Sequence, residues 1–368
     1  MGLTAAIDDL DFSLLEGRRL GLLTNSAART ASGQTTLDTL RSHPSAEINC
    51  IFTPEHGLTA TAEPAQPVPD GQSAGTRVIT LYGARLQPDP DHLNDIDLVV
   101  IDLPGLGVRC FTYLATAWRT IIVAAEARTP VLILDRPNSL GRSIELPIGQ
   151  ARAKGLLCPL TVPLRHGLTL GEILRMAATE AHIPQPDIAL CAPVAEPGPP
   201  WWPPSPNLPS LECAQAYPGT VLIEGTGLSE GRGTNAPFLK IGAPTLPAGA
   251  LADHLGRLDL PGLAIRSTDF TPSQSKHAGH PCQGIELSIT DPEGARPVTL
   301  ILHLLAWLRD NNPDSLALND MLDALAGTDT LRRWCETANS PVEALTANWQ
   351  DLTKEFENRR APHLLYGA

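Results

Sequence analysis

The sequence predicts an α/β fold with a parallel sheet in its first half. Apolar runs of strand length alternate there with helical stretches, the pattern of strands joined by right-handed helical crossovers. Polar residues follow each run, and ligand sites of such sheets lie at the carboxyl ends of the strands. The length of 368 residues is typical of two domains.

The predicted elements of the first half follow in order. Strands are expected at Arg18 to Asn25, Ala46 to Phe52, Arg77 to Tyr82, Leu98 to Leu103 and Pro130 to Leu134. Helices are expected at Ser32 to Ser42 and Cys110 to Ala127, and a long loop at Thr59 to Gly75. No G-x-G-x-x-G or Walker motif is present, which disfavours a nucleotide-dependent oxidoreductase.

Polar residues cluster at the ends of these strands. Glu55 and His56 come directly after the second strand, and they form either a site or a capping pair. Asp102 lies near the end of the fourth strand, and Asp135, Arg136 and Asn138 follow the fifth. The carboxyl edge of the sheet is therefore the expected place of the site.

The second half contains more helix. Helices are predicted at Gly171 to Ala181, Asp253 to Leu258 and Pro297 to Arg309, with strands at Leu260 to Ile265 and Ile285 to Ile289. Thr169 can cap the first of these helices, and His166 either faces a site or caps the same helix. Trp201 and Trp202 lie in a proline-rich segment, where they either stack on a sugar or fill a domain interface.

The stretch from Tyr217 to Pro244 has the highest density of functional groups. Val221 to Ile223 reads as a buried strand, and Glu224, Glu230, Arg232 and Thr234 follow it among four glycines. A glycine-rich turn with a structural Glu–Arg pair is one interpretation. A polyol site is the other, and we favour it because carboxylate, guanidinium and hydroxyl groups suit hydroxyl-rich ligands.

Composition excludes several functions. The net charge of -13 and pI near 5.2 argue against nucleic acid and anionic membranes as partners. The 7 cysteines are widely spaced without a CxxC, which predicts free thiols in a reducing compartment and no zinc site. The first residues do not resemble a signal peptide, and no apolar run approaches the length of a membrane span. These features predict a cytoplasmic protein.

An ordered set of motifs carries a resemblance to a known family. The motifs are FTPEHG at 52–57, LYG at 81–83, GVRCFTY at 107–113, DRPN at 135–138, RHGLTLGE at 165–172, PSPN at 204–207, YPG at 217–219, EGTGLSEGRGT at 224–234, IGAP at 241–244, SK at 275–276 and CQG at 282–284. With this set the chain resembles, over nearly its whole length, the family of exo-acting β-N-acetylmuramidases.

The resemblance implies a Rossmann-like N-terminal domain, a smaller α/β (α+β) C-terminal domain, and a site in the cleft between them. We place these domains at residues 1–155 and 156–368. The implied reaction is hydrolysis of a non-reducing terminal N-acetylmuramic acid from peptidoglycan fragments, without cofactor or metal. The expected partner is a small saccharide containing muramic acid, with no nucleic acid or membrane partner, and the protein is expected to be a monomer or homodimer.

The resemblance also assigns roles to single residues. Glu55, in PEHG, is the first choice for the general acid or base, and Glu230 and Glu224 are candidates for the partner carboxylate or for holding sugar hydroxyls. Arg232 and Arg136 suit the lactyl carboxylate of muramic acid. The other candidate substrate-binding residues are His56, Arg109, Tyr113, Asn138, His166, Asn207 and Thr234.

The chain departs from the family pattern at several positions. Gln66 lies where the family usually has a glutamate, and Pro104-Gly105 replaces a Gln-Asp pair. Leu58-Thr59-Ala60 stands where a basic residue and a glycine are usual. These departures leave two alternatives open, a non-catalytic binder of cell-wall amino sugars and a hydrolase of a different glycoside.

Overall fold

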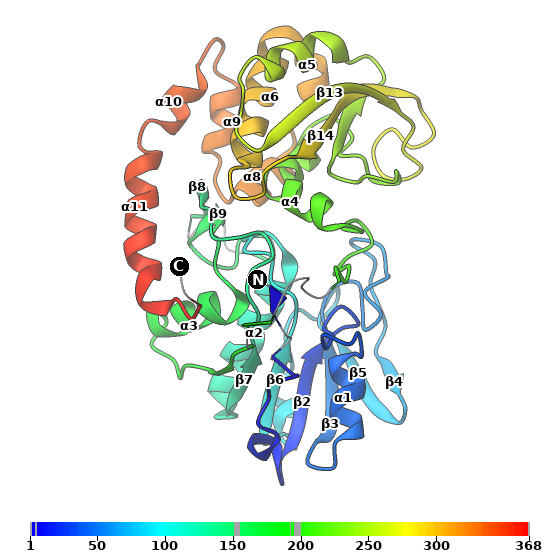
Figure 1. Cartoon of the computed structure of the whole chain (residues 1–368), viewed down its shortest axis with the longest axis vertical. Coiled ribbons are helices and arrows are strands. Elements are labelled where there is room, and N and C mark those ends of the chain that lie inside the picture. The colour runs from blue at the N-terminus through cyan, green and yellow to red at the C-terminus, as the bar shows by residue number, and fades with distance from the viewer. Residues whose placement is uncertain (1, 4–5, 151–154, 192, 195–199, 367–368) are drawn as a thin grey trace.

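The structure is a computed structural model that describes residues 2–3, 6–150, 155–191, 193–194 and 200–366. Figure 1 shows two parts, one built on a large sheet and the other on a smaller sheet with several helices. The predicted α/β fold class is confirmed.

The larger part is built on a seven-stranded sheet in the order β10-β7-β6-β2-β3-β5-β4. Its strands are β2 (Arg19–Thr24), β3 (Glu47–Thr53), β4 (Gly71–Ser73), β5 (Thr76–Thr80), β6 (Leu98–Asp102), β7 (Val131–Leu134) and β10 (Asp187–Ala189). All neighbouring pairs are parallel except β4 with β5. The five predicted strands of the first half are confirmed, while β4 lies at the end of the predicted long loop. The central strands are buried on both faces, as a sheet covered by helices requires.

Three helices connect these strands, namely α1 (Thr36–Ser42), α2 (Thr112–Ala127) and α3 (Leu170–Glu180). Thr169 caps α3 as predicted, in a capping box with Glu172. β10 follows α3 in the chain and pairs with β7, so the large sheet takes its edge strand from beyond residue 155. The boundary between residues 155 and 156 stays a prediction.

The smaller part contains a three-stranded antiparallel sheet in the order β12-β14-β13. Its strands are β12 (Lys240–Ala243), β13 (Leu263–Phe270) and β14 (Cys282–Ile289). Its helices are α4 (Leu211–Thr220), α5 (Ala248–Gly256), α6 (Pro297–Asn311), α7 (Pro313–Leu316), α8 (Asp320–Ala326), α9 (Thr330–Cys335), α10 (Val342–Thr346) and α11 (Trp349–Arg360).

Short elements complete the described chain. β1 (Gly2–Leu3) pairs with β11 (Pro193–Val194), and β8 (Glu145–Ile148) pairs with β9 (Pro163–Arg165). The 3-10 helices are η1 (Phe12–Leu15), η2 (Pro90–Leu93), η4 (Val221–Gly225) and η5 (Ala361–His363).

The predicted strand at Val221 to Ile223 is wrong. These residues form η4, which continues directly from α4. All three side chains are buried, and periodicity cannot distinguish a short buried apolar run in a strand from one in a helix. Glu224 therefore lies in the last turn of a helix, rather than after a strand.

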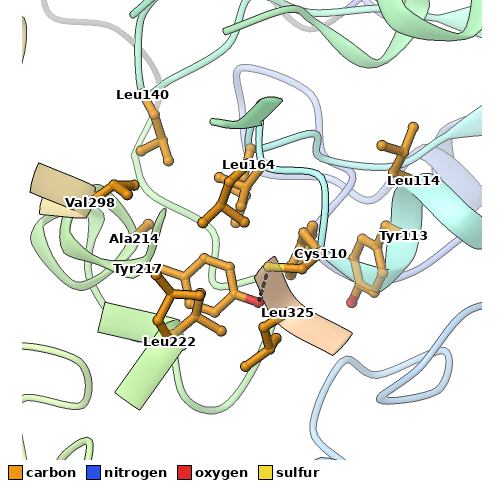
Figure 2. Close-up of a cluster of buried hydrophobic side chains, with 14 of the residues drawn as sticks. Cys110, Tyr113, Leu114, Leu140, Leu164, Ala214, Tyr217, Leu222, Val298 and Leu325 are labelled. Atoms are coloured by element: carbon orange, nitrogen blue, oxygen red, sulfur yellow. Dashed lines mark hydrogen bonds between the residues drawn. The ribbon is translucent and has the colours of Figure 1, made fainter. Parts of the chain in front are cut away.

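One apolar core joins the two parts. Figure 2 shows Cys110 of the larger part beside Tyr217 of the smaller part. Both belong to one cluster of buried apolar residues. The Cys110 thiol lies 3.9 Å from the Tyr217 hydroxyl. Because well-packed cores have little free volume, the shared core holds the two parts in one arrangement.

The C-terminal segment returns to the larger part (Figure 1). Arg359, near the end of α11, forms a bidentate pair with Glu180 of α3, at 2.5 and 2.7 Å. The Arg360 guanidinium donates to the carbonyls of Arg142 and His166, each at 3.0 Å. These contacts form a second attachment between the two parts, distant in sequence from the first.

Three expectations from composition can be compared with the described residues. All 7 cysteines are buried and free. No described helix has the length and apolarity needed to span a membrane. Nor do the described residues contain a group of three or more histidine, cysteine, aspartate or glutamate side chains that could hold a metal ion.

Candidate active site

A cavity of about 500 Å³ lies between the two parts. The larger part contributes residues that follow β3 and β5 and residues at the start of α2, while the smaller part contributes η4, the segment after it, and α8. Five candidate site residues line it, Glu55, His56, Asn207, Glu224 and Arg232. Its volume is in the range of ligand sites, ~300–1,000 Å³.

Glu55 lies on the wall formed by the larger part. Both carboxylate oxygens accept hydrogen bonds, one from the Thr112 hydroxyl at 2.7 Å and the other from the Ala65 backbone N–H at 3.1 Å. The Tyr82 hydroxyl is also hydrogen-bonded to Glu55. The side chain is buried and its direct partners here are neutral, so Glu55 is held in one orientation in the pocket.

His56 is fixed beside Glu55 by an unusual backbone conformation. Its φ of 71° lies in the left-handed region, which few residues other than glycine adopt. Nδ1 lies 2.6 Å from the Ala62 carbonyl oxygen, so this nitrogen carries the hydrogen. Burial lowers the pKa of the imidazole, which favours the neutral ring. The neutral ring then has Nε2 as a hydrogen-bond acceptor.

Glu224 lies on the wall formed by the smaller part and has a different environment. One oxygen pairs with the Arg232 guanidinium at 2.7 Å. Burial raises the pKa of Glu224 to about 7, against the opposing effect of Arg232. The charges of Glu230 and Glu55 contribute to this rise. A carboxyl group with this pKa can hold a proton at neutral pH and release it in a reaction.

Glu230 lies behind this wall. It is buried, and its oxygens lie 3.6 Å from Arg232 Nε and 3.4 Å from Lys276 Nζ. Lys276 also donates to the carbonyl oxygens of Ile223 and Thr226, at 2.7 and 3.0 Å. Glu230 thus holds the Arg232 side chain that pairs with Glu224, and Lys276 holds the backbone beside η4.

The remaining surface of the pocket is largely apolar. It includes the side chains of Phe111, Tyr217, Phe238 and Leu325. Asn207 is a polar exception, because its buried side-chain Nδ2 has no hydrogen-bond partner among the described residues. An unsatisfied buried donor at a pocket wall is a candidate contact for a ligand carbonyl.

Six of the predicted substrate-binding residues do not line the pocket. Arg109 is fully buried, and its guanidinium donates to the carbonyls of Pro147, Val162 and Leu325. The Tyr113 hydroxyl lies 2.7 Å from Asn25 Nδ2 and donates to the Pro204 carbonyl. Both side chains join distant segments of the chain.

The other four form hydrogen bonds or ion pairs elsewhere. Arg136, Asn138 and His166 lie at or near the carboxyl edge of the sheet, and Thr234 lies in the turn after Glu230. Arg136 forms an ion pair with Asp102. Asn138 donates to the Gly141 carbonyl, and His166 Nδ1 accepts from the Leu168 N–H. Thr234 donates to the Gly231 carbonyl at 2.6 Å.

Sequence reasoning omitted several residues that shape the pocket. Tyr82 and Thr112 bind Glu55, and Lys276 binds Glu230. Each lies within a motif noted in the sequence, LYG, GVRCFTY and SK respectively. A search for neutral donors and cations in those motifs would have found them.

Among the departures from the family pattern, Gln66 directly follows Ala65, whose N–H donates to the pocket carboxylate Glu55. Gln66 is exposed, and Gly105 packs against Leu170 of α3. Neither residue, nor Pro104, lines the pocket. Trp201 is partly buried and donates to the Leu208 carbonyl, whereas Trp202 packs against Arg29 outside the pocket.

Family models match almost the whole chain. The N-terminal model of the exo-β-N-acetylmuramidase NamZ matches residues 20–212, and the C-terminal model matches residues 215–366. The chain belongs to the NamZ family.

A relative in this family is the peptidoglycan β-N-acetylmuramidase NamZ of Bacillus subtilis strain 168. It is 33% identical over 365 residues, covering 96% of this chain and 88% of that protein. Two crystal structures of DUF1343 family proteins from Bacteroides fragilis also resemble the NamZ-family chain, each at 26% identity. One has a TM-score of 0.89 and the other 0.78, and the alignments cover 99% and 100% of this chain and 99% of each neighbour.

Proposed function

We propose that this protein is a glycoside hydrolase that releases the non-reducing terminal N-acetylmuramic acid from peptidoglycan fragments. The chain is a NamZ-family member, and a glutamate from each part of the molecule lines its pocket. Glycosidases generally use two carboxyl groups, one on each side of the scissile bond. The presence of Glu55 and Glu224 in the lining of one pocket, one from each part of the molecule, is the observation that carries the proposal.

Glu224 is the general acid in this proposal. Its pKa of about 7 keeps a large fraction protonated at neutral pH, so it can donate a proton to the leaving oxygen. Glu55 is the second carboxylate and acts at the anomeric carbon, either directly or through water. Its hydrogen bonds to Thr112 and Ala65 hold it in one orientation, which favours reaction at a defined position.

Arg232 is the cation best placed for the lactyl carboxylate of muramic acid. It lines the pocket, and its guanidinium has N–H groups beyond the one that donates to Glu224 at 2.7 Å. In the same proposal His56 Nε2 accepts from a sugar hydroxyl. The Asn207 amide donates to a carbonyl such as that of the N-acetyl group.

Location and assembly are also part of the proposal. Seven buried free thiols suit a reducing compartment, so we place the protein in the cytoplasm, acting on small fragments in cell-wall recycling. The net charge of -13 is unsuited to nucleic acid or anionic membranes. A monomer or homodimer stays the expected assembly, with no metal or cofactor required.

The test is direct. Purified protein is incubated with a muramyl-glucosamine disaccharide and with 4-nitrophenyl β-N-acetylmuramide, and released muramic acid is measured by chromatography. Wild type should release it from both, while Glu55→Gln should release almost none. A folded wild type that releases none from either substrate contradicts the proposal, and saturable binding without turnover would indicate a sugar-binding protein.

A further inference from the structure

A second cavity, of about 370 Å³, lies next to the active-site pocket. Ser205 lines both cavities. The segment from residue 55 to 65 also borders both, since Glu55 and Ala65 face the first while Thr59 and Thr61 face the second. The two cavities thus adjoin along the same two chain segments.

The second cavity has the chemistry of a saccharide site. Trp202 and the side chains of Pro203, Pro206 and Pro209 give it an apolar wall. Four hydroxyl-bearing residues, Ser26, Thr59, Thr61 and Ser205, also line it. The Ser26 hydroxyl donates to the Thr59 carbonyl, and the Thr59 and Thr61 hydroxyls are hydrogen-bonded to each other. Rigid apolar surface combined with a few polar groups is typical of sites that bind small polar molecules.

Arg29 gives this cavity a positive charge. Its guanidinium lies 4.5 Å from the centre of the Trp202 ring and donates to the carbonyls of Ser26 and Gly33, each at 2.7 Å. No carboxylate pairs with it among the described residues. An arginine held by a ring and by carbonyls keeps its charge available for an anionic ligand.

We propose that this cavity is a leaving-side subsite, which binds the part of the saccharide beyond the scissile bond. This inference rests on the proposed function. The terminal sugar fills the active-site pocket, and the next sugars extend past Ser205 into the second cavity. An N-acetylhexosamine lies against Trp202 and the prolines, and a carboxylate-bearing substituent further along the fragment pairs with Arg29.

The sequence of this chain suits a neutral sugar at the rim of the subsite. Leu58-Thr59-Ala60 stands where a basic residue and a glycine are usual in the family pattern. The Thr59 and Thr61 hydroxyls lie 2.7 Å apart, and both residues are exposed. They present hydroxyl groups to the cavity, leaving Arg29 as its cation.

The experiment compares substrates that do and do not reach the second cavity. Initial rates are measured with 4-nitrophenyl β-N-acetylmuramide, with the muramyl-glucosamine disaccharide, and with a tetrasaccharide of the same repeat. Trp202→Ala should lower kcat/KM for the tetrasaccharide by about tenfold. The free energy lost with the contact between the sugar and the aromatic ring corresponds to about one order of magnitude in kcat/KM. The nitrophenyl substrate should change less than twofold.

A second variant tests the cavity without removing Trp202, whose substitution could disturb the local structure. Thr61→Trp fills the cavity from an exposed position and should give the same selective loss, while Thr330→Trp, at an exposed threonine beside a different cavity, should change none of the three rates. Equal losses on all three substrates, or no loss on the tetrasaccharide with Thr61→Trp, would overturn the inference.

Failure of the proposed function would look different. Wild type would then release no muramic acid from any substrate, and the second cavity would be tested by calorimetric titration with an N-acetylglucosamine-containing tetrasaccharide. Binding heat in wild type that disappears in Thr61→Trp would support the subsite. Absent heat, or heat unchanged in Thr61→Trp, would overturn it.

Discussion

The two walls of the pocket hold the same type of side chain in different ways. On the larger part, Glu55 accepts hydrogen bonds from the neutral donors Thr112, Ala65 and Tyr82. On the smaller part, Glu224 pairs with a guanidinium in the vicinity of other carboxylates, and its pKa is about 7. The difference indicates that the environment of each glutamate, rather than the residue type, determines its chemical role.

Glu55→Gln should give the largest effect and test the role of the larger part. The substitution keeps the shape of the side chain and removes its negative charge, so the activity on both the disaccharide and the nitrophenyl substrate should fall by ~10⁴-fold. Steady-state rates with both substrates provide the measurement. Circular dichroism of the variant controls for folding, and a folded variant with more than about a tenth of wild-type activity would exclude Glu55 from the reaction.

Glu224→Gln should reduce activity on the disaccharide more than activity on the nitrophenyl substrate. A general acid matters most when the leaving group is a poor one, so disaccharide hydrolysis should fall by ~10²–10⁴-fold. Hydrolysis of the nitrophenyl substrate should fall less than about tenfold, because nitrophenolate leaves without protonation. The ratio of the two rates is the measurement, and equal losses on both substrates would remove the general-acid role from Glu224.

Arg232→Gln should move the pH profile. The general acid acts in its protonated form, so kcat/KM in wild type should decline as pH rises through about 7. Arg232 lowers the pKa of Glu224, so its removal should shift this decline to higher pH. A profile measured from pH 4 to 10 tests this, and a decline that moves to lower pH would contradict the assignment.

Thr112→Val should give the smallest effect and serves as the matched contrast. It removes one neutral hydrogen bond to Glu55, at 2.7 Å, and leaves the Glu224 environment intact. We expect activity to fall by about tenfold, which corresponds to the free energy of one hydrogen bond to a charged group. The pH at which kcat/KM declines should stay the same. If Thr112→Val shifted the decline of kcat/KM as much as Arg232→Gln does, the two walls would not be electrostatically distinct.

Much of the fold and part of the site could be predicted from the sequence. The strands of the large sheet are continuous apolar runs, and Glu55 directly follows one of them, so its place at the carboxyl edge follows from the pattern. Glu224 was found from the density of polar groups around it, although the predicted strand before it is the 3-10 helix η4.

Side-chain direction could not be predicted in the same way. Arg109 lies in the same motif as Thr112, but its guanidinium points into the core and binds carbonyls from both parts of the molecule. Glu230 lies in the same glycine-rich segment as Arg232, but it is behind the pocket wall. These directions depend on contacts with residues far away in the chain, which no local pattern specifies.

The return of α11 to the larger part affects how substrate enters and product leaves. Widening the cleft by a hinge would have to disturb the shared apolar core and either break the contacts of Arg359 and Arg360 with the larger part or displace α11 from the other helices of the smaller part. We therefore expect exchange to occur through an aperture of nearly constant width. Turnover would then be governed by diffusion through that opening and by the loops at its rim, so that the size of the entrance itself selects among cell-wall fragments.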